Sequence, residues 1–174
     1  ISKITNNITL PQYSGKALKL KGIYLVNAVN KTNPGSSDAL TNDNFSNKIK
    51  YEGEQTDLLG SRFATPVEVS AASPYTRESR MYCCPNPVTT DSKSQTWSKR
   101  FTRLVVEVEF DGETMYYPIS FEQTLKANSS YEIPDLQITR PGSPNPDEPL
   151  VLGSVNYTVN VKPWELVSMG TVII

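Results

Sequence analysis

Apolar and polar residues alternate along several short stretches of the chain, and this alternation predicts β-strands. In residues 155–162, valine or tyrosine occupies every odd position and a polar residue occupies every even one. A period of two is typical of a strand with one buried face. A second apolar run follows Pro163 and Trp164 and extends over residues 166–174. We expect this run either to pack within its own domain or to complete a sheet elsewhere.

The clearest hairpin pattern lies between residues 104 and 121. Its inward positions are Leu104, Val106, Val108 and Phe110 on the way out and Met115, Tyr117, Ile119 and Phe121 on the way back. Asp111-Gly112 between them favours a type I′ turn, because both central residues need positive φ. Pro118 cannot donate to a ladder, so its amide position should face an edge or an outward site. Glu107 and Glu109 fall on the opposite parity, which predicts a solvated outer face.

The rest of the chain is also read as strands and loops. Further strands are predicted at residues 4–10, 18–27, 67–69, 80–84 and 131–139, the second with a bulge at Gly22 and the last broken at Pro134. Residues 28–65 are polar and predict a long surface loop with a short helix near 44–51. Residues 141–149 contain four prolines and predict an extended connector. With seven to nine strands and no amphipathic helix of three turns, the pattern predicts an all-β, Greek-key-like sandwich.

Composition narrows the classes of function. A length of 174 residues favours one domain. The net charge of −1 argues against a nucleic-acid surface, and no apolar run approaches the roughly 20 residues of a membrane helix. The sequence has no initiator Met and no signal-peptide pattern, so we interpret it as a processed or truncated part of a longer precursor.

The side chains available for chemistry are few. Without histidine, a His-dependent triad or a His-containing zinc site is excluded. Cys83 and Cys84 are neighbours and should point to opposite faces of a strand, which predicts one buried and one half-exposed free thiol. Glu107 and Glu109 could imitate the acid pair of a glycosidase, but a solvated face is favoured. We therefore expect no enzyme, no cofactor and no metal site.

Several short motifs follow one another in a specific order along the chain. Residues 20–27 read Leu-Lys-Gly-Ile-Tyr-Leu-Val-Asn, residues 81–86 read Met-Tyr-Cys-Cys-Pro-Asn, and residues 102–110 and 116–119 form the predicted hairpin; segments 128–131, 142–149 and 155–164 come after them. This order resembles the C-terminal domain of fimbrillins, the major-subunit-like pilins of type V pili in Gram-negative anaerobes. The resemblance extends over about residues 4–174. Family precursors also carry a lipoprotein signal and an N-terminal β-domain, so the chain is similar to the second domain of a two-domain pilin.

The resemblance implies a division of the chain and a way of assembling. Residues 1–162 would form the fimbrillin-like sandwich and residues 163–174 a donor strand that fills a groove in a neighbouring pilin subunit. The residues expected to contact the partner are Leu166, Val167, Met169, Val172, Ile173 and Ile174. The protein would be a structural subunit at the cell surface, after export of its precursor as an outer-membrane lipoprotein, and would support adhesion. The alternative is an adhesin at the pilus tip that contacts glycan or host protein through residues 28–65. It also remains open that the last segment pairs within its own sandwich.

Overall fold

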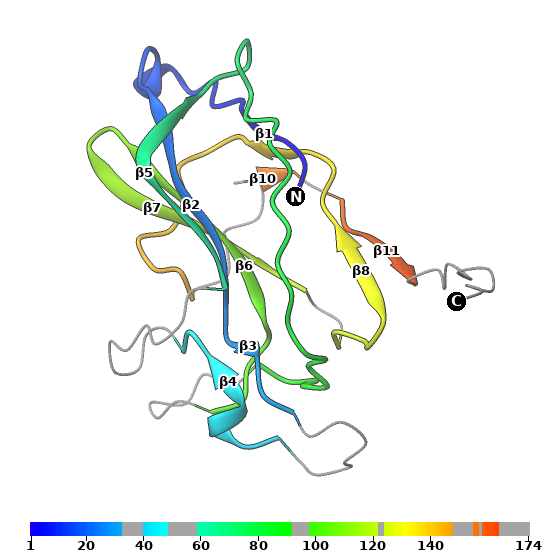
Figure 1. Ribbon diagram of the computed structural model, residues 1–174. Coiled ribbons are helices and arrows are strands. Elements are labelled where there is room, and N and C mark those ends of the chain that lie inside the picture. The colour runs from blue at the N-terminus through cyan, green and yellow to red at the C-terminus, as the bar shows by residue number, and fades with distance from the viewer. Residues whose placement is uncertain are drawn as a thin grey trace, which may run out of the picture.

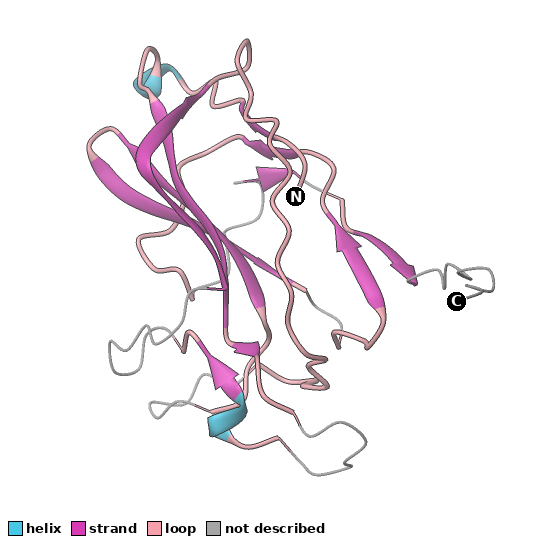
Figure 2. Ribbon diagram, in the orientation of Figure 1, coloured by secondary structure: helices cyan, strands magenta, loops and turns pink. Residues whose placement is uncertain are grey.

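The computed structural model describes residues 1–32, 40–48, 59–91, 98–121, 124–147, 155–156 and 158–163. Within these ranges the protein is built of strands joined by loops, with two single-turn 3₁₀ helices (Figure 2). The elements are β1 (Ile4–Asn6), η1 (Pro11–Tyr13), β2 (Leu18–Val26), β3 (Ala28–Val29), η2 (Asn42–Asn44), β4 (Phe45–Ser46), β5 (Leu59–Val69), β6 (Arg103–Phe110), β7 (Glu113–Ser120), β8 (Ser129–Glu132), β9 (Leu136–Ile138), β10 (Val155–Asn156) and β11 (Asn160–Pro163). The all-β prediction is confirmed.

The larger layer is an antiparallel sheet in the order β5-β2-β6-β7 (Figure 1). Opposite β6, the register of β2 shifts by one residue between Leu20 and Gly22, which is the predicted bulge. The extra residue keeps Leu18 and Leu20 on the same buried face as Ile23 and Leu25. These four side chains therefore pack into one core, although the apolar positions change from even to odd numbers half-way along β2.

The predicted hairpin forms between β6 and β7. Phe110 lies opposite Glu113, and Asp111 and Gly112 have φ of 53° and 82°, so the two-residue loop has the positive φ values that a type I′ turn requires. Pro118 lies on β7, which is an edge strand of this sheet. Two residues earlier, the backbone of Tyr116 pairs outward with Ser143, so the position of the Pro118 nitrogen also faces away from β6.

The second layer is divided into two sheets. β1 pairs in parallel with β9, β10 pairs antiparallel with β9, and β8 pairs separately with β11. The predicted strand 131–139 is thus cut at Pro134, and its halves belong to different sheets. The predicted strand 155–162 is likewise divided into β10 and β11. Ile4, Leu136 and Ile138 of this layer join the core face of the larger sheet in one apolar cluster, which makes the fold a sandwich.

Three predictions about residues 28–85 are wrong. Residues 28–65 are not all loop, because β3 is fully buried and pairs with β4, and β5 already begins at Leu59. The helix predicted near 44–51 is a 3₁₀ turn at Asn42–Asn44 instead, since Phe45 is buried beside Val29 in a strand. Residues 49–58 lie outside the described part. Residues 80–84 form no regular strand in the described chain. Just beyond them, Asn86 makes an isolated antiparallel bridge to Leu125.

The predicted alternation of inward and outward side chains is wrong for three residues. Val161 was expected inside but is 50% exposed; in the described part of the chain, β11 is an edge strand of a sheet of two strands. Glu107 was expected in solvent but is only 5% exposed: it accepts a hydrogen bond from the Tyr24 hydroxyl (3.0 Å) and pairs with Arg62 (3.2 Å). Both cysteines are free, and Cys84 is half-buried as predicted for one of the two; the other, Cys83, is exposed although a buried thiol was predicted.

No helix in the described residues is long and apolar enough to cross a membrane.

Candidate functional site

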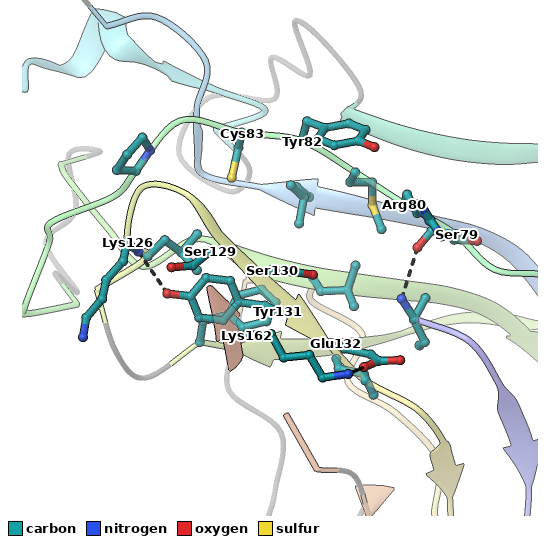
Figure 3. Close-up of a pocket in the computed structure, with 18 of the residues that line it drawn as sticks. Ser79, Arg80, Tyr82, Cys83, Lys126, Ser129, Ser130, Tyr131, Glu132 and Lys162 are labelled. Atoms are coloured by element: carbon teal, nitrogen blue, oxygen red, sulfur yellow. Dashed lines mark hydrogen bonds and ion pairs between the residues drawn. The ribbon is translucent and has the colours of Figure 1, made fainter. Parts of the chain in front are cut away.

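A groove of about 720 Å³ separates residues 78–85 from β8 (Figure 3). The larger sheet contributes apolar side chains from its core face, Leu25 on β2 and Leu104 on β6, and Phe121 follows β7. Met81 on one wall and Ile133 on the other add to this apolar floor. Side chains of the sandwich core therefore form the floor of the groove, between two lengths of extended chain.

The first wall, residues 78–85, is held at its ends. Ser79 exchanges backbone hydrogen bonds with Ile1 (3.0 and 3.1 Å), and the Cys84 amide donates to the Val29 carbonyl (2.7 Å). Between these points, residues 80–83 make no backbone–backbone hydrogen bond to any other described residue. Their amides and carbonyls are available for a partner strand.

The second wall is β8. Its residues pair with β11 from Ser129 opposite Pro163 to Glu132 opposite Asn160. In the described part of the chain, the sheet ends there, and no strand lies against the other edge of β8. An unpaired edge presents a row of amides and carbonyls and is a template for pairing with another chain.

The position of β1 indicates the width of the groove. This strand lies between the two chain segments that continue the walls, one before residue 78 and one after β8. The backbone of Ile4 pairs with Tyr75 on one side, while Ser2 and Leu136 make the backbone bonds on the other (Ser2 amide to Ile133 carbonyl, Leu136 amide to Lys3 carbonyl). Walls that flank one strand are two strand spacings apart, roughly 9.5 Å. The groove continues the line of β1, so its walls are set for the insertion of one further strand.

The rim of the groove is polar. Arg80 pairs with Glu78 (2.9 Å) on one wall, and Lys162 of β11 pairs with Glu132 (3.0 Å) on the other. Tyr82 is 68% exposed. Beside the second wall, the Tyr131 hydroxyl accepts a hydrogen bond from the Lys126 amide (2.9 Å). Apolar floor, free backbone edges and charged rim are the features of a site that binds an extended peptide.

The groove has no activated nucleophile. The sulfur of Cys83 lies on the groove side of its wall (Figure 3). Burial of the thiol, followed by the neighbouring Cys84, raises the pKa of Cys83 to about 11, although the residue as a whole is exposed. A thiol with a raised pKa is a poor nucleophile at neutral pH. Among the residues that the structure describes, no group of three or more His, Cys, Asp or Glu side chains could hold a metal ion.

A second polar site is buried beneath the start of β6. We call Arg100, Arg103, Asp91 and Asp147 the arginine–aspartate cluster. Asp147 accepts hydrogen bonds from Arg100, from Arg103 (2.8 Å) and from Asn27 (3.1 Å), and Arg103 also donates to Asp91. The cluster anchors the end of the proline-rich connector to the larger sheet. Sequence analysis missed it, although Asp147 lies in the connector and the two arginines are three residues apart.

The residues predicted to contact a partner, Leu166, Val167, Met169, Val172, Ile173 and Ile174, lie outside the described residues. Their role as a donor strand stays a prediction, as does a contact of residues 28–65 with glycan or host protein. The groove itself was not predicted. Its one signal was the strand-like pattern of residues 80–84, for which the sequence offers no obvious partner.

Comparison with known proteins bears on the fold. No family model matches the chain, and neither does any curated protein. A solved structure from Parabacteroides distasonis, of a protein named for a role in cell adhesion, superposes with a TM-score of 0.56 and 17% sequence identity over 94% of this chain. What the two share is the fold. A similarly named protein from Bacteroides eggerthii gives a TM-score of 0.47 and 16% identity over 93% of this chain. The chain spans only 58% and 54% of the lengths of these two proteins.

Proposed function

We propose that the protein is a non-enzymatic structural subunit of a cell-surface adhesion assembly, a pilus of the fimbrillin type, and that it joins other subunits by β-strand exchange. The observation that carries the proposal is the groove, where two unpaired backbone edges face each other across an apolar floor. The fold shared with a protein named for cell adhesion supports a surface role. The order of sequence motifs supports the narrower assignment to a pilus.

Three other sheet edges carry a feature that blocks pairing, which favours the groove as the place of exchange. β5 contains Pro66, and its pairing with β2 is interrupted between Arg62 and Val67. β7 contains Pro118 and is covered by Ser143. β11 is four residues long and ends at a proline. Natural proteins protect edges in these ways against unwanted association. Residues 80–83 and the free edge of β8 contain no proline and lack such cover within the described chain.

The energy of exchange is sufficient only if the backbone takes part. Four apolar side chains buried in the groove would contribute roughly 6–12 kcal/mol, at about 1.5–3 kcal/mol each. Association has an entropic cost of roughly 4–15 kcal/mol. The gain from apolar burial and the entropic cost are similar, so the backbone hydrogen bonds to both walls must provide the net free energy of association. A groove with two free edges supplies twice the ladder of a single exposed edge.

Protection of Cys83 tests the proposal. In a C84S background, Cys83 is the one thiol of the chain, and a strand in the groove would cover it. We expect the assembled protein to react with iodoacetamide at least about tenfold more slowly than a variant that ends at Pro163, with equal circular dichroism for both. Light scattering should show that this deletion removes assembly. Equal alkylation rates in assembled and unassembled protein, or assembly that survives the deletion, would contradict the proposal.

A further inference from the structure

We infer that the groove has a built-in stop: the backbone bridge between Asn86 and Leu125 closes its far end and fixes the register of a strand that pairs with its walls. Asn86 is then the positioning residue of the groove. This inference rests on the proposed function, which places a strand of another subunit between the walls. It adds where that strand must end and which backbone groups of this chain it meets.

The walls of the groove converge at the end remote from β1. Near β1 they are two strand spacings apart, because the start of the chain lies between Ser79 and Ile133. At the other end, Asn86 and Leu125 exchange two backbone hydrogen bonds of 3.0 Å. Chains that pair directly are about 4.8 Å apart, so an inserted strand has no room there. Seven residue steps separate Ser79 from Asn86, at most about 24 Å, which limits the inserted part to about six residues.

The side chain of Asn86 holds this bridge in place. Asn86 is 3% exposed, and its side-chain amide donates to the Arg100 carbonyl (2.9 Å) and to the Thr102 hydroxyl (3.0 Å). Its side-chain oxygen accepts a hydrogen bond from the Val88 amide (3.1 Å). A buried amide with these partners is costly to displace, because each would be left unpaired. The stop is thereby pinned to the chain that leads into β6.

The alternation of the backbone identifies the groups that a strand would meet on the first wall. Successive residues of an extended chain direct their amide and carbonyl groups to opposite sides. Ser79 bonds to the start of the chain on the groove side, and the Cys84 amide donates to β3 on the other side. Met81 and Cys83 alternate in step with Ser79. The first wall therefore presents the amides and carbonyls of these two residues to the groove before the stop.

The second wall has the same pattern on the free edge of β8. The Ile133 carbonyl accepts from the Ser2 amide on the groove side, so Tyr131 and Ser129, in step with Ile133, also face the groove. The position of Pro163 agrees, because it lies opposite Ser129 and suits a pair that makes no hydrogen bond. Each wall thus has one pairing residue near β1 and one near the stop.

Amide hydrogen exchange tests the assignment, read by NMR after the protein is dissolved in an aprotic solvent. The comparison is between the assembled full chain and the variant that ends at Pro163. The amides of Arg80 and Tyr82 point away from the groove and should exchange alike in both. Those of Asn86 and Leu125 should be protected in both, because their bridge belongs to the subunit. We expect assembly to slow exchange at least about tenfold at Met81, Cys83, Ser129 and Tyr131.

The variant N86A removes the three side-chain hydrogen bonds that pin the stop. We expect the pair near the stop, Cys83 and Ser129, to lose at least about fivefold more of the added protection than the pair near β1. The matched control is N47G. Asn47 is also buried, its side chain donates to the Leu25 carbonyl (2.6 Å), and glycine tolerates its φ of 52°. N47G should leave the ratio between the two pairs unchanged, which separates positioning from a general loss of stability.

The variant T102V removes one of the three bonds and should change the same ratio in the same direction, so the test does not depend on the folding of N86A. Added protection at residues 80 and 82 instead would overturn the assigned register while strand exchange stands. Protection that continues past residue 86, with faster exchange at Leu125, would show a strand that passes the bridge and would overturn the stop. A parent-like ratio in both N86A and T102V would overturn the role of Asn86. If assembly changes no wall amide, the proposed function itself is contradicted.

Discussion

Replacing Asp147 with asparagine tests how much of the stability of the fold depends on the arginine–aspartate cluster. D147N keeps the shape of the side chain and removes its charge. Asp147 is 1% exposed and faces the guanidinium groups of Arg100 and Arg103, which are themselves buried. Among the residues that the structure describes, Asp91 would then be the carboxylate that still pairs with both guanidinium groups. The side-chain NH₂ of the new asparagine would also face the N–H groups of a guanidinium, so that two hydrogen-bond donors would point at each other.

The expected loss in the free energy of unfolding is about 3–5 kcal/mol, the usual cost of removing one partner from a buried ion pair. One effect works against it. Burial raises the pKa of Asp147, an effect that Arg103, Arg100 and Asn27 oppose, so the carboxylate itself is poorly solvated and its removal relieves some of that penalty. We therefore expect the lower end, about 3 kcal/mol. Domains have about 5–15 kcal/mol in all, so the loss is a large part of the margin.

Urea unfolding, followed by fluorescence and circular dichroism, measures this difference directly. The matched control is D111N, the same change at the exposed ion pair with Lys16. Asp111 has φ of 53°, which asparagine tolerates well, so the control should lose less than about 1 kcal/mol. A loss below about 1 kcal/mol for D147N would refute the reasoning, because it would show that both arginines find other partners when Asp147 is neutral.

Three further predictions concern the backbone, the cluster and the groove. G60A should lower the free energy of unfolding by at least about 3 kcal/mol, since Gly60 has φ of 153° and its new Cβ would collide with the Ile23 carbonyl. In the same urea titration G112A should lower it by about 1–2 kcal/mol, because Gly112 has φ of 82° but open space around it. Partial burial opposes ionisation of Asp91, but the Phe101 amide and the two arginines hold its pKa below the usual value. This contribution to stability is present above pH ~4 and is lost as the pH falls through the lower folded pKa, so D91N should flatten the acid limb of a stability–pH curve, and an unchanged limb would exclude Asp91 as a source. Alkylation of unassembled C84S protein should keep rising up to about pH 11, the raised pKa of Cys83; a plateau near pH 9 would mean that the thiol is not shielded.

Features that depend on neighbouring residues were predictable from the sequence. The type I′ turn at Asp111-Gly112 and the bulge before Gly22 follow from local backbone preferences and from parity, and both are present. The break at Pro134 was predicted as well, because proline cannot continue a ladder. Its consequence, a change of sheet, was not, since the pairing partner of a strand is decided by distant residues.

The alternation of apolar and polar residues could not predict which distant residues cover a face of a strand or pair with its edge. Glu107 lies on the outer parity as expected, but Tyr24 and Arg62 from two other strands bury it. Asp147 is 47 residues from Arg100 along the chain, too far for any periodicity to connect them. Residues 80–84 have the composition of a strand and yet no sheet partner among the described residues. Under the proposed function, the failed prediction and the groove have the same cause, because the strand that pairs with residues 80–83 would come from another subunit.

The prolines on the outer strands of the larger sheet have a consequence for the geometry of growth. Under the proposed function, each subunit has one receptive site and one tail, so its valency is two. Contacts of this head-to-tail kind do not close on themselves when the rotation between neighbours leaves the ends apart, and they produce a filament. Because Pro66 and Pro118 keep lateral pairing from starting, such a filament would lengthen at its tip without branching or thickening into sheets.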